Sequence, residues 1–336
     1  MISIDHFGSE NTRRITEFTA FQKTLYADDP FFIPDDTVVL PGIHARYFLA
    51  RQEDTICGRA AGLVNPLMTY KGRSAGMAGF FECTEDTAVA ESLLSAVREW
   101  LREEGCGWCI GPMNGSTWRK YRITVPDPEP PFFLDNHHKP WYQSLFEAAG
   151  FSVAERYIST RIPLTKASGA GIEDFEPALR RRGLRVRSIR MDDFTEDIRA
   201  IYELSIKAFA ENALYTPIDP DEFQGLYQKA AGFIDPKFVR LCEDASGELR
   251  GFIFAVEDRF QASSSTILIK TLAVKSGAKG KGLGGYLVKR LHRDAYQAGY
   301  ETIIHALMHE KNVSTRVAET DSRPFRQYRL YAMEIQ

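Results

Sequence analysis

The segment that most constrains the fold of this chain runs from Ser264 to Tyr300. It begins with an apolar run rich in β-branched residues, from Thr266 to Val274, and this composition predicts a buried strand. A glycine-rich stretch follows. The residues after it place Leu283, Leu287, Leu291 and Ala295 on one face of a predicted helix, which Gly299 ends. The order of elements is therefore strand, glycine-rich turn and helix.

The turn has the sequence Lys-Gly-Lys-Gly-Leu-Gly-Gly over residues 279–285. Glycine has no Cβ, so its backbone adopts positive φ and approaches an anion closely. Successive N–H groups of such a turn lie beside the unpaired N–H donors and the positive dipole end of the helix. Lys279 and Lys281 add positive charge. We therefore expect a phosphate-bearing ligand at this turn.

Two other phosphate-binding motifs fit this turn poorly. A P-loop requires Ser or Thr after its Gly-Lys pair, whereas Gly282 follows Lys281. Gly280, Gly282 and Gly285 satisfy the dinucleotide pattern G-x-G-x-x-G, but five residues separate Val274 from Gly280 and about fifty remain after the turn. That leaves too little chain for the βαβαβ half of a dinucleotide fold. A plain strand-to-helix turn with incidental glycines stays open as an alternative.

Thr271-Leu272-Ala273-Val274 and the turn from Lys279 to Gly284 together resemble the signature of the GNAT superfamily of N-acetyltransferases. The family loop is written Arg/Gln-x-x-Gly-x-Gly/Ala, and Lys279 stands at its first position. The resemblance implies that the strand diverges from its neighbour and binds the pantetheine arm of acetyl-CoA, while the loop amides hold the pyrophosphate. The cofactor-binding residues that it implies are Leu272, Ala273, Val274, Lys279, Gly280, Lys281, Gly282, Leu283, Gly284, Gly285 and Asn312.

The two halves of the chain show a similar order of predicted elements: a helix, several strands, then helix, strand, helix and strand. We interpret this as an internal duplication with little surviving sequence identity. The predicted fold is α/β of the α+β type, with two tandem GNAT-like domains, each a mixed, mostly antiparallel sheet flanked by helices. The predicted domains are residues 1–164 and 184–336, joined by a linker with a helix at 165–183.

The first half lacks the glycine turn. The segment from Phe81 to Asp86 joins its strand to its helix, and carboxylates there would repel a pyrophosphate. The segment from Leu145 to Phe151 resembles the family's "Leu-Tyr-x-x-x-Gly-Phe" segment, with Phe146 where a tyrosine general acid often stands. We therefore expect a degenerate first domain that does not bind CoA.

Acetyl transfer to an amine requires a free-base nucleophile, a polarised thioester carbonyl and a proton for the departing thiolate. The second half has no tyrosine at the expected place after Asn312, so its general acid is not identified. The candidate catalytic residues are Tyr328, Glu319 and His309, with Glu257 and His305 as further candidate bases. The candidate substrate-binding residues are Lys270, Glu211 and Tyr215. For each of these, an ordinary structural role is the alternative.

Charge and composition exclude several classes of function. The net charge of −3 gives no electrostatic footprint for nucleic acid. No run of about eighteen apolar residues predicts a membrane span, and the polar N-terminus does not fit a secretory signal, so we expect a cytoplasmic protein. Five cysteines without a signal suggest reduced thiols. Cys106 and Cys109 have no second pair, so no metal site is predicted.

The sequence therefore predicts direct transfer of an acetyl group from acetyl-CoA to the amine of a small molecule or peptide. The alternative is a non-catalytic acyl-CoA-binding protein with a regulatory or partner-binding role. The identity of the acceptor and the oligomeric state do not follow from the sequence.

Overall fold

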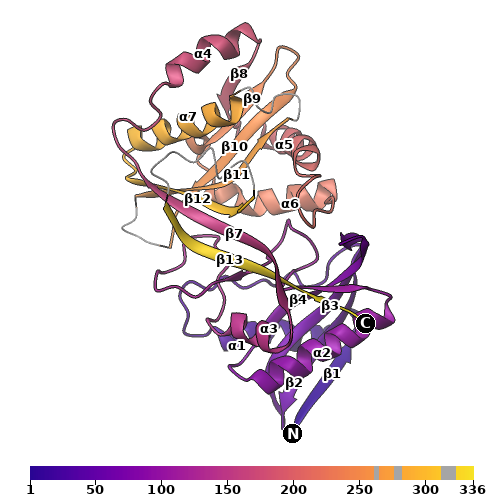
Figure 1. Cartoon of the computed structure of the whole chain (residues 1–336). Helices are drawn as coiled ribbons and strands as arrows, with labels where there is room; N and C mark the ends of the chain where they lie inside the picture. The colour runs from indigo at the N-terminus through magenta and orange to yellow at the C-terminus, as the bar shows by residue number, and fades with distance from the viewer. Residues whose placement is uncertain (261–264, 276–281, 312–322) are drawn as a thin grey trace. The chain divides into compact units, whose positions relative to one another are not determined.

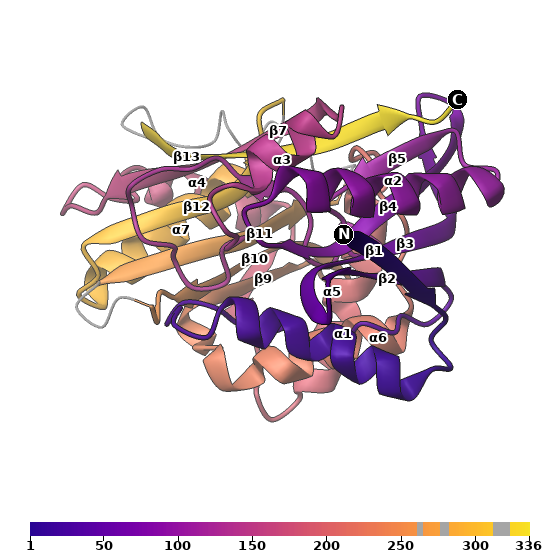
Figure 2. The same cartoon turned by 90° about the horizontal axis from the view of Figure 1, so that it is seen from below.

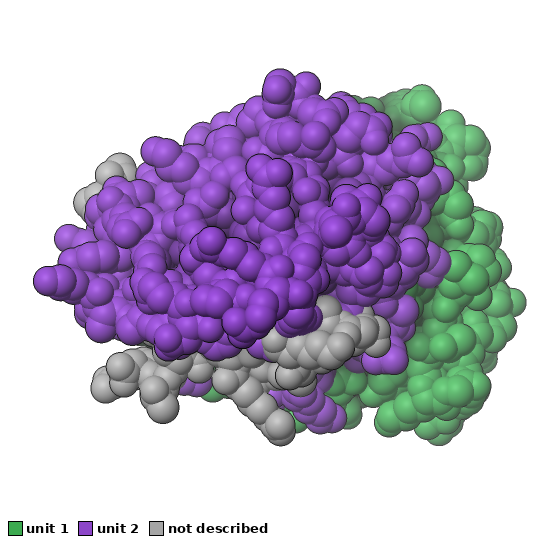
Figure 3. All heavy atoms as spheres, turned by 90° about the horizontal axis from the view of Figure 1, so that it is seen from above, with its two compact units in different colours: residues 1–156, 214–216, 327–336 green, residues 157–213, 217–326 purple. Residues whose placement is uncertain are grey.

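The computed structural model describes residues 1–260, 265–275, 282–311 and 323–336 (Figure 1). The chain forms two compact units, coloured separately in Figure 3. Unit 1 comprises Met1–Arg156, Leu214–Thr216 and Gln327–Gln336, and unit 2 comprises Tyr157–Ala213 and Pro217–Arg326. Within the described residues, no helix combines the length and hydrophobicity that a membrane span requires.

The sheet of unit 1 is mixed and mostly antiparallel. Its strands follow the order β1 (Ile2–Phe7), β2 (His44–Gln52), β3 (Thr55–Tyr70), β4 (Arg73–Cys83), β5 (Trp108–Gly111) and β13 (Arg323–Glu334), and β6 (Ile123–Thr124) also pairs with β13. The β4–β5 pair is parallel, whereas the β1–β2, β2–β3, β3–β4, β5–β13 and β6–β13 pairs are antiparallel. Figure 2 shows α1 (Thr12–Leu25) and α2 (Thr87–Glu103) on opposite faces of these strands.

Helix α2 forms as its sequence predicts. The Asp86 carboxylate caps its first turn by accepting from the Val89 backbone N–H at 3.1 Å. The apolar stripe of α2 is buried in a core that also takes in α3 (Tyr142–Ala148), including Tyr142 and Phe146. This apolar stripe, rather than helix propensity, holds α2 on the sheet.

The sheet of unit 2 repeats the same plan. Its strands follow the order β7 (Ser152–Pro163), β12 (Thr302–His309), β11 (Thr266–Val274), β10 (Leu249–Glu257), β9 (Val239–Glu243) and β8 (Arg185–Ser188). The β11–β12 pair is parallel and its neighbours are antiparallel. Helices α4 (Ile172–Arg181) and α7 (Leu283–Gln297) pack into one core with the sheet. Helices α5 (Phe194–Ala208) and α6 (Pro220–Ala230) lie on the other face, as Figure 1 shows, and the short 3₁₀ turns η1 (Ala231–Phe233) and η2 (Pro236–Phe238) follow them.

The compact units do not coincide with the consecutive segments 1–164 and 184–336 that the sequence suggests. Strand β7 begins in unit 1 and ends in unit 2, whereas β13 begins in unit 2 and ends in unit 1. The segment 165–183, expected as a linker, contributes α4 to unit 2, where Ile172 and Leu179 are buried. Strand pairing joins residues that are far apart in sequence, so chain order alone does not show where such boundaries fall.

A buried carboxylate joins β8 to α5 in unit 2. Asp197 is 0% exposed and accepts from both terminal nitrogens of Arg187, at 2.7 Å each. It also accepts from the backbone N–H of Arg190 at 2.7 Å and from its Nη2 at 2.6 Å. Although burial alone would raise the pKa of Asp197, these hydrogen bonds lower it to about 2. The carboxylate is therefore ionised and fully paired at neutral pH.

We expect Asp197→Ala to lower the free energy of unfolding of unit 2 by about 3 kcal/mol at pH 7, because it leaves two arginines without their shared buried partner. Urea denaturation followed by circular dichroism measures this loss. The matched control is Glu196→Ala on the same helix, where the carboxylate is 59% exposed and lies 3.9 Å from Arg199. The control is expected to cost less than about 0.5 kcal/mol. Equal losses in the two variants would contradict the prediction.

Candidate functional site

Strand β11 contains a β-bulge at Lys270. It pairs with β10 in antiparallel register, and the register shifts where Ala255 pairs with Ile269 and Phe254 pairs with Thr271. Lys270 is therefore the extra residue on β11. Such a bulge bends its strand and interrupts the ladder locally.

Strands β11 and β12 stop pairing at the same place. Their parallel pairing covers residues 266–269 of β11 and ends with Ile269 opposite His305. On its other edge β12 pairs with β7 from Thr302 to His309, so β12 continues after its ladder with β11 has ended. In the described part of the chain, the edge of β11 from Thr271 to Val274 has no ladder to β12, so its N–H and C=O groups on that side are available to a ligand.

The N-terminus of α7 lies beside the end of β11. Gly282 is its N-cap residue, with φ of +80°, and a Cβ there would come within 3.1 Å of the Phe175 ring. Both the conformation and the space therefore favour glycine. A Cβ on Gly284 would lie 3.6 Å from Val274, and one on Gly285 would have no neighbour within 4 Å.

No acidic side chain lies in the first turn of α7. The unpaired N–H groups of that turn and the positive end of the helix dipole are therefore not neutralised locally. This geometry suits an anion such as a pyrophosphate. The divergent edge of β11 and the open N-terminus of α7 together define the candidate site.

Two buried histidines connect α7 to β12 where β11 and β12 part. His292 on α7 is 0% exposed, His305 on β12 is 4% exposed, and their Nε2 atoms are 2.9 Å apart. Burial, with a smaller contribution from His292, lowers the pKa of His305 to about 3. His305 is therefore a neutral member of a hydrogen-bonded pair and a poor general base at neutral pH.

The sequence-predicted residues fall into three groups. Lys279, Gly280, Lys281, Asn312 and Glu319 lie outside the described residues. Leu272, Ala273, Val274, Gly282, Leu283, Gly284 and Gly285 lie on β11 and at the start of α7, and half-buried Lys270 forms the bulge. The remaining candidates lie elsewhere in the fold: His305 in the histidine pair, Glu257 at the end of β10, and Tyr328, His309, Glu211 and Tyr215.

Tyr328 is a core residue of unit 1. It is 0% exposed and its hydroxyl donates to Asp135 Oδ1 at 2.8 Å. A buried hydroxyl engaged by a carboxylate is not available to a substrate, so we do not assign Tyr328 a catalytic role. The sequence placed it in the second domain because the closing strand follows that domain in the chain.

The other candidates do not belong to β11 or α7. His309 ends β12, its Nδ1 accepts from the Lys311 backbone N–H at 3.1 Å, and its ring lies edge-on to Tyr157. Glu211 is exposed in the loop after α5. Tyr215 belongs to unit 1, where its ring centroid lies 6.0 Å from that of Trp118. Their roles in catalysis or substrate binding stay predictions.

Unit 1 contains a similar pair of parallel strands that stops early, but there a side chain of the protein binds the freed backbone. The parallel pairing of β4 and β5 ends with Met77 opposite Ile110, and β4 bulges near Phe80, whose φ is +50°. The Phe80 backbone N–H donates to Asn114 Oδ1 at 2.7 Å. In unit 1 a side chain of the protein therefore occupies a backbone donor at the bulge of β4.

Two carboxylates, one at the end of β4 and one after it, are engaged by the protein itself. Tyr142 donates its hydroxyl to Glu82 at 2.5 Å, and the Arg59 guanidinium lies 3.9 Å away. Burial raises the pKa of Glu82, against a lowering by Arg59. Asp86 caps α2 through the Val89 N–H. That the first domain does not bind CoA stays a prediction.

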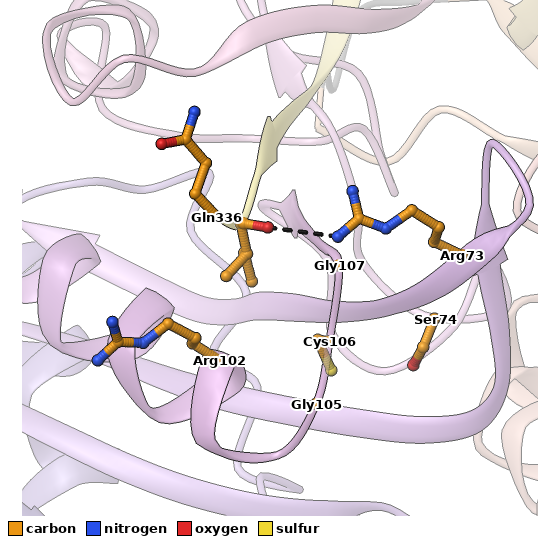
Figure 4. A pocket seen from close by; sticks show the side chains of 8 residues that line it. Arg73, Ser74, Arg102, Gly105, Cys106, Gly107 and Gln336 are labelled. Atoms are coloured by element: carbon orange, nitrogen blue, oxygen red, sulfur yellow. Dashed lines mark hydrogen bonds between the residues drawn. The ribbon is translucent and has the colours of Figure 1, made fainter.

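A surface pocket of unit 1 offers no comparable chemistry. Its lining residues, drawn in Figure 4, are Arg73, Ser74, Arg102, Gly105, Cys106, Gly107, Ile335 and Gln336. The Arg73 guanidinium there already donates to Glu334 at 2.6 Å and to the Ile335 carbonyl at 3.4 Å. Burial raises the pKa of the Cys106 thiol, and all five cysteines are buried and free. No group of potential metal ligands is found among the described residues.

Comparison with known proteins finds a family match in the second half of the chain and similar folds along all of it. The profile of the Acetyltransferase (GNAT) family matches residues 198–319. Protein YghO of Escherichia coli (strain K12) is 24% identical over 252 residues, which cover 69% of this chain and 63% of that protein. Bacterial ceramide synthase of Caulobacter vibrioides (strain NA1000 / CB15N) is 23% identical over 258 residues, covering 71% of this chain and 66% of that protein. The chain thus spans slightly less than two thirds of the length of these relatives.

A solved structure extends the likeness to the whole chain. The tandem GNAT protein from the clavulanic acid biosynthesis pathway matches 100% of this chain and 99% of its own, with a TM-score of 0.54 and 11% identity. At that identity the match shows the fold alone. The predicted fold class, a tandem GNAT arrangement of mixed sheets and helices, is confirmed.

We expect the stability of unit 2 to fall with acidity because of His305. Its pKa of about 3 lies below the value near 6.5 of an unfolded histidine, so the unfolded state binds the proton first. The contribution is fully present above about pH 6.5 and is lost as the pH falls towards 3, at about 1.4 kcal/mol per pH unit. Chemical denaturation between pH 7 and pH 4.5 should show a shallower pH dependence in His305→Asn than in wild type.

The control for this experiment is His44→Asn, because the His44 side chain is 58% exposed. It should keep the wild-type pH dependence. The same slope in wild type and His305→Asn would show that the buried histidine pair does not resist protonation.

Proposed function

We propose that this protein transfers an acetyl group from acetyl-CoA to an amine, because residues 198–319 match the Acetyltransferase (GNAT) family. The observation that supports it best is the divergence of β11 from β12 beside an α7 N-terminus without acidic residues. The two features provide a backbone edge for an extended arm and an anion site at its end.

The arrangement suggests how acetyl-CoA would lie. The pyrophosphate would take the N–H groups of the first turn of α7, where Gly284 and Gly285 leave room for close approach. The pantetheine arm would run along Leu272, Ala273 and Val274 and pair with the backbone there, as an added strand does. The thioester would then lie near the bulge at Lys270.

The proposed chemistry is direct transfer. The amine nitrogen attacks the thioester carbonyl carbon, the C–N bond forms, and the C–S bond breaks with its electron pair on sulfur. A backbone N–H next to the bulge would polarise the carbonyl oxygen, which is the interaction that stabilises such transition states most. We propose a small molecule or peptide as acceptor. One relative is named a ceramide synthase, which is compatible with acyl transfer but does not identify the acceptor of this chain.

The second candidate function is acyl-CoA binding without turnover. It is favoured by the burial of Tyr328, which removes one candidate proton donor from catalysis. The two functions differ in one measurement: an enzyme releases CoA from acetyl-CoA faster when its amine acceptor is added, whereas a regulatory protein binds acetyl-CoA without such release.

We expect Gly284→Glu to raise the dissociation constant for acetyl-CoA at least about tenfold, because it places a carboxylate beside the proposed pyrophosphate site. The fold should tolerate the change, since a Cβ at Gly284 makes ordinary contact with Val274 and an acidic residue suits a helix N-terminus. Isothermal titration calorimetry at fixed salt measures the effect. The matched control is Gly232→Glu, which adds the same charge at an exposed glycine with no neighbour within 4 Å. Absence of binding to folded wild-type protein would refute the proposed function.

The same titration should give one bound acetyl-CoA per chain. The backbone donor of Phe80 in unit 1 is occupied by Asn114, and the turn after β4 has no glycine-rich sequence. Unit 1 therefore offers no equivalent site. A stoichiometry of two would contradict the expected degeneracy of the first domain.

A further inference from the structure

Strand β12 contains a β-bulge of its own, directly after its last residue that pairs with β11. In the antiparallel ladder between β12 and β7, the register shifts between His305 and Met308. Residues 306 and 307 of β12 therefore lie opposite the single residue Ser159 of β7. Such a bulge bends its strand and increases the local twist. Because the ladder with β11 ends at His305, the bend in β12 begins where that ladder ends.

The backbone of this bulge is strained at Leu307. Its φ is +60°, in the left-handed region that a leucine side chain disfavours. Strand β12 continues past this residue to His309, so Leu307 is not part of a turn that ends the strand. A non-glycine residue keeps a left-handed conformation only where the surrounding structure imposes it. The bulge therefore requires a contact that holds Leu307.

Ser159 supplies this contact from the neighbouring strand. The Leu307 backbone N–H donates to Ser159 Oγ at 2.9 Å, and Ser159 is 0% exposed. The hydroxyl thus accepts from the backbone of the bulged residue at a place where water does not reach it. Removing the hydroxyl would take away this acceptor and with it part of the stabilisation that offsets the strained backbone of Leu307.

We propose that Ser159 is a positioning residue for the binding of acyl-CoA. By holding β12 bent at Leu307, it keeps the edge of β11 from Thr271 to Val274 open before the cofactor binds. This inference rests on the proposed function, which places the pantetheine arm along that edge. An edge that is already open requires no separation of strands during binding, and such pre-organisation raises affinity. Ser159 itself acts through the backbone of β12 and needs no contact with acyl-CoA.

The first test is hydrogen exchange of the unliganded protein, measured by mass spectrometry. In Ser159→Ala we expect Leu307 to leave the left-handed conformation, so that β12 straightens and extends its ladder with β11. The segment 271–274 should then take up deuterium about tenfold more slowly than in wild type. A serine that only stabilised the fold would give a change of the opposite sign, because its loss would make exchange in this segment faster.

The matched control is Ser168→Ala. Ser168 is another buried serine of unit 2, 8% exposed, and its Oγ also accepts a backbone N–H at 2.9 Å, from Thr165. It precedes α4 and belongs to none of the strands β7, β11 and β12. Its loss removes an equivalent hydrogen bond without releasing the bulge. Exchange of the segment 271–274 should not become slower in Ser168→Ala.

The second test is the affinity for acetyl-CoA, measured by calorimetry. Ser159→Ala should raise the dissociation constant about tenfold. Adding Leu307→Gly should bring it back to within about threefold of the wild-type value, because glycine adopts a positive φ readily and keeps the bulge without help from Ser159. Adding Leu307→Ala removes a similar part of the side chain but retains the Cβ, so it should not restore binding.

Slower exchange of the segment 271–274 in Ser159→Ala, together with recovery of affinity through Leu307→Gly but not Leu307→Ala, supports the inference. Unchanged or faster exchange of that segment, or equal affinities of the two double variants, shows that the inference about Ser159 is wrong while the proposed function stands. If folded wild-type protein does not bind acetyl-CoA, the proposed function is wrong and the inference fails with it.

Discussion

The structure of both units depends on one constraint: every backbone N–H and C=O that loses its strand partner must find another. In each unit a parallel strand pair stops halfway, at Met77 and Ile110 in unit 1 and at Ile269 and His305 in unit 2. Unit 1 satisfies a freed donor internally, through Asn114. In unit 2 the described residues form no ladder between β12 and the edge of β11 from Thr271 to Val274. The same strand geometry is thus satisfied by a protein side chain in unit 1, whereas in unit 2 it forms a candidate binding edge.

Local sequence signals predicted the elements around the candidate site accurately. The strand from Thr266 to Val274 has the bounds that its apolar run indicates. The helix follows as predicted, but it begins at Leu283, inside the stretch expected as a turn, and ends at Gln297. These signals act over a few residues, so they do not depend on the rest of the fold. Gly282 also has the positive φ for which a glycine turn is suited.

Contacts between distant residues were not predictable in this way. Asn114 is 34 residues from the Phe80 donor that it occupies, and Asp135 is 193 residues from the Tyr328 hydroxyl that donates to it. Nothing in the local sequence distinguishes Asn114 or Asp135 from an ordinary surface residue. Tyr328 shows the converse error: its position late in the chain suggested the second domain, but its strand segment completes the sheet of unit 1. Sequence order is a poor guide wherever a strand pairs outside its own neighbourhood.

The membership of β13 has a consequence for synthesis of the chain. Residues 327–336 provide the strand segment that pairs with β5 and β6, although more than two hundred residues separate β6 from them. During translation the N-terminal half of the protein emerges with the outer edge of β5 uncovered, and it acquires its last strand only when residues 327–336 emerge from the ribosome. The N-terminal unit therefore completes its sheet last, after the entire chain of unit 2 has been made. Proteins with two domains commonly fold one domain after the other in the order of synthesis. In this protein unit 1 cannot complete its fold before unit 2 has been synthesised.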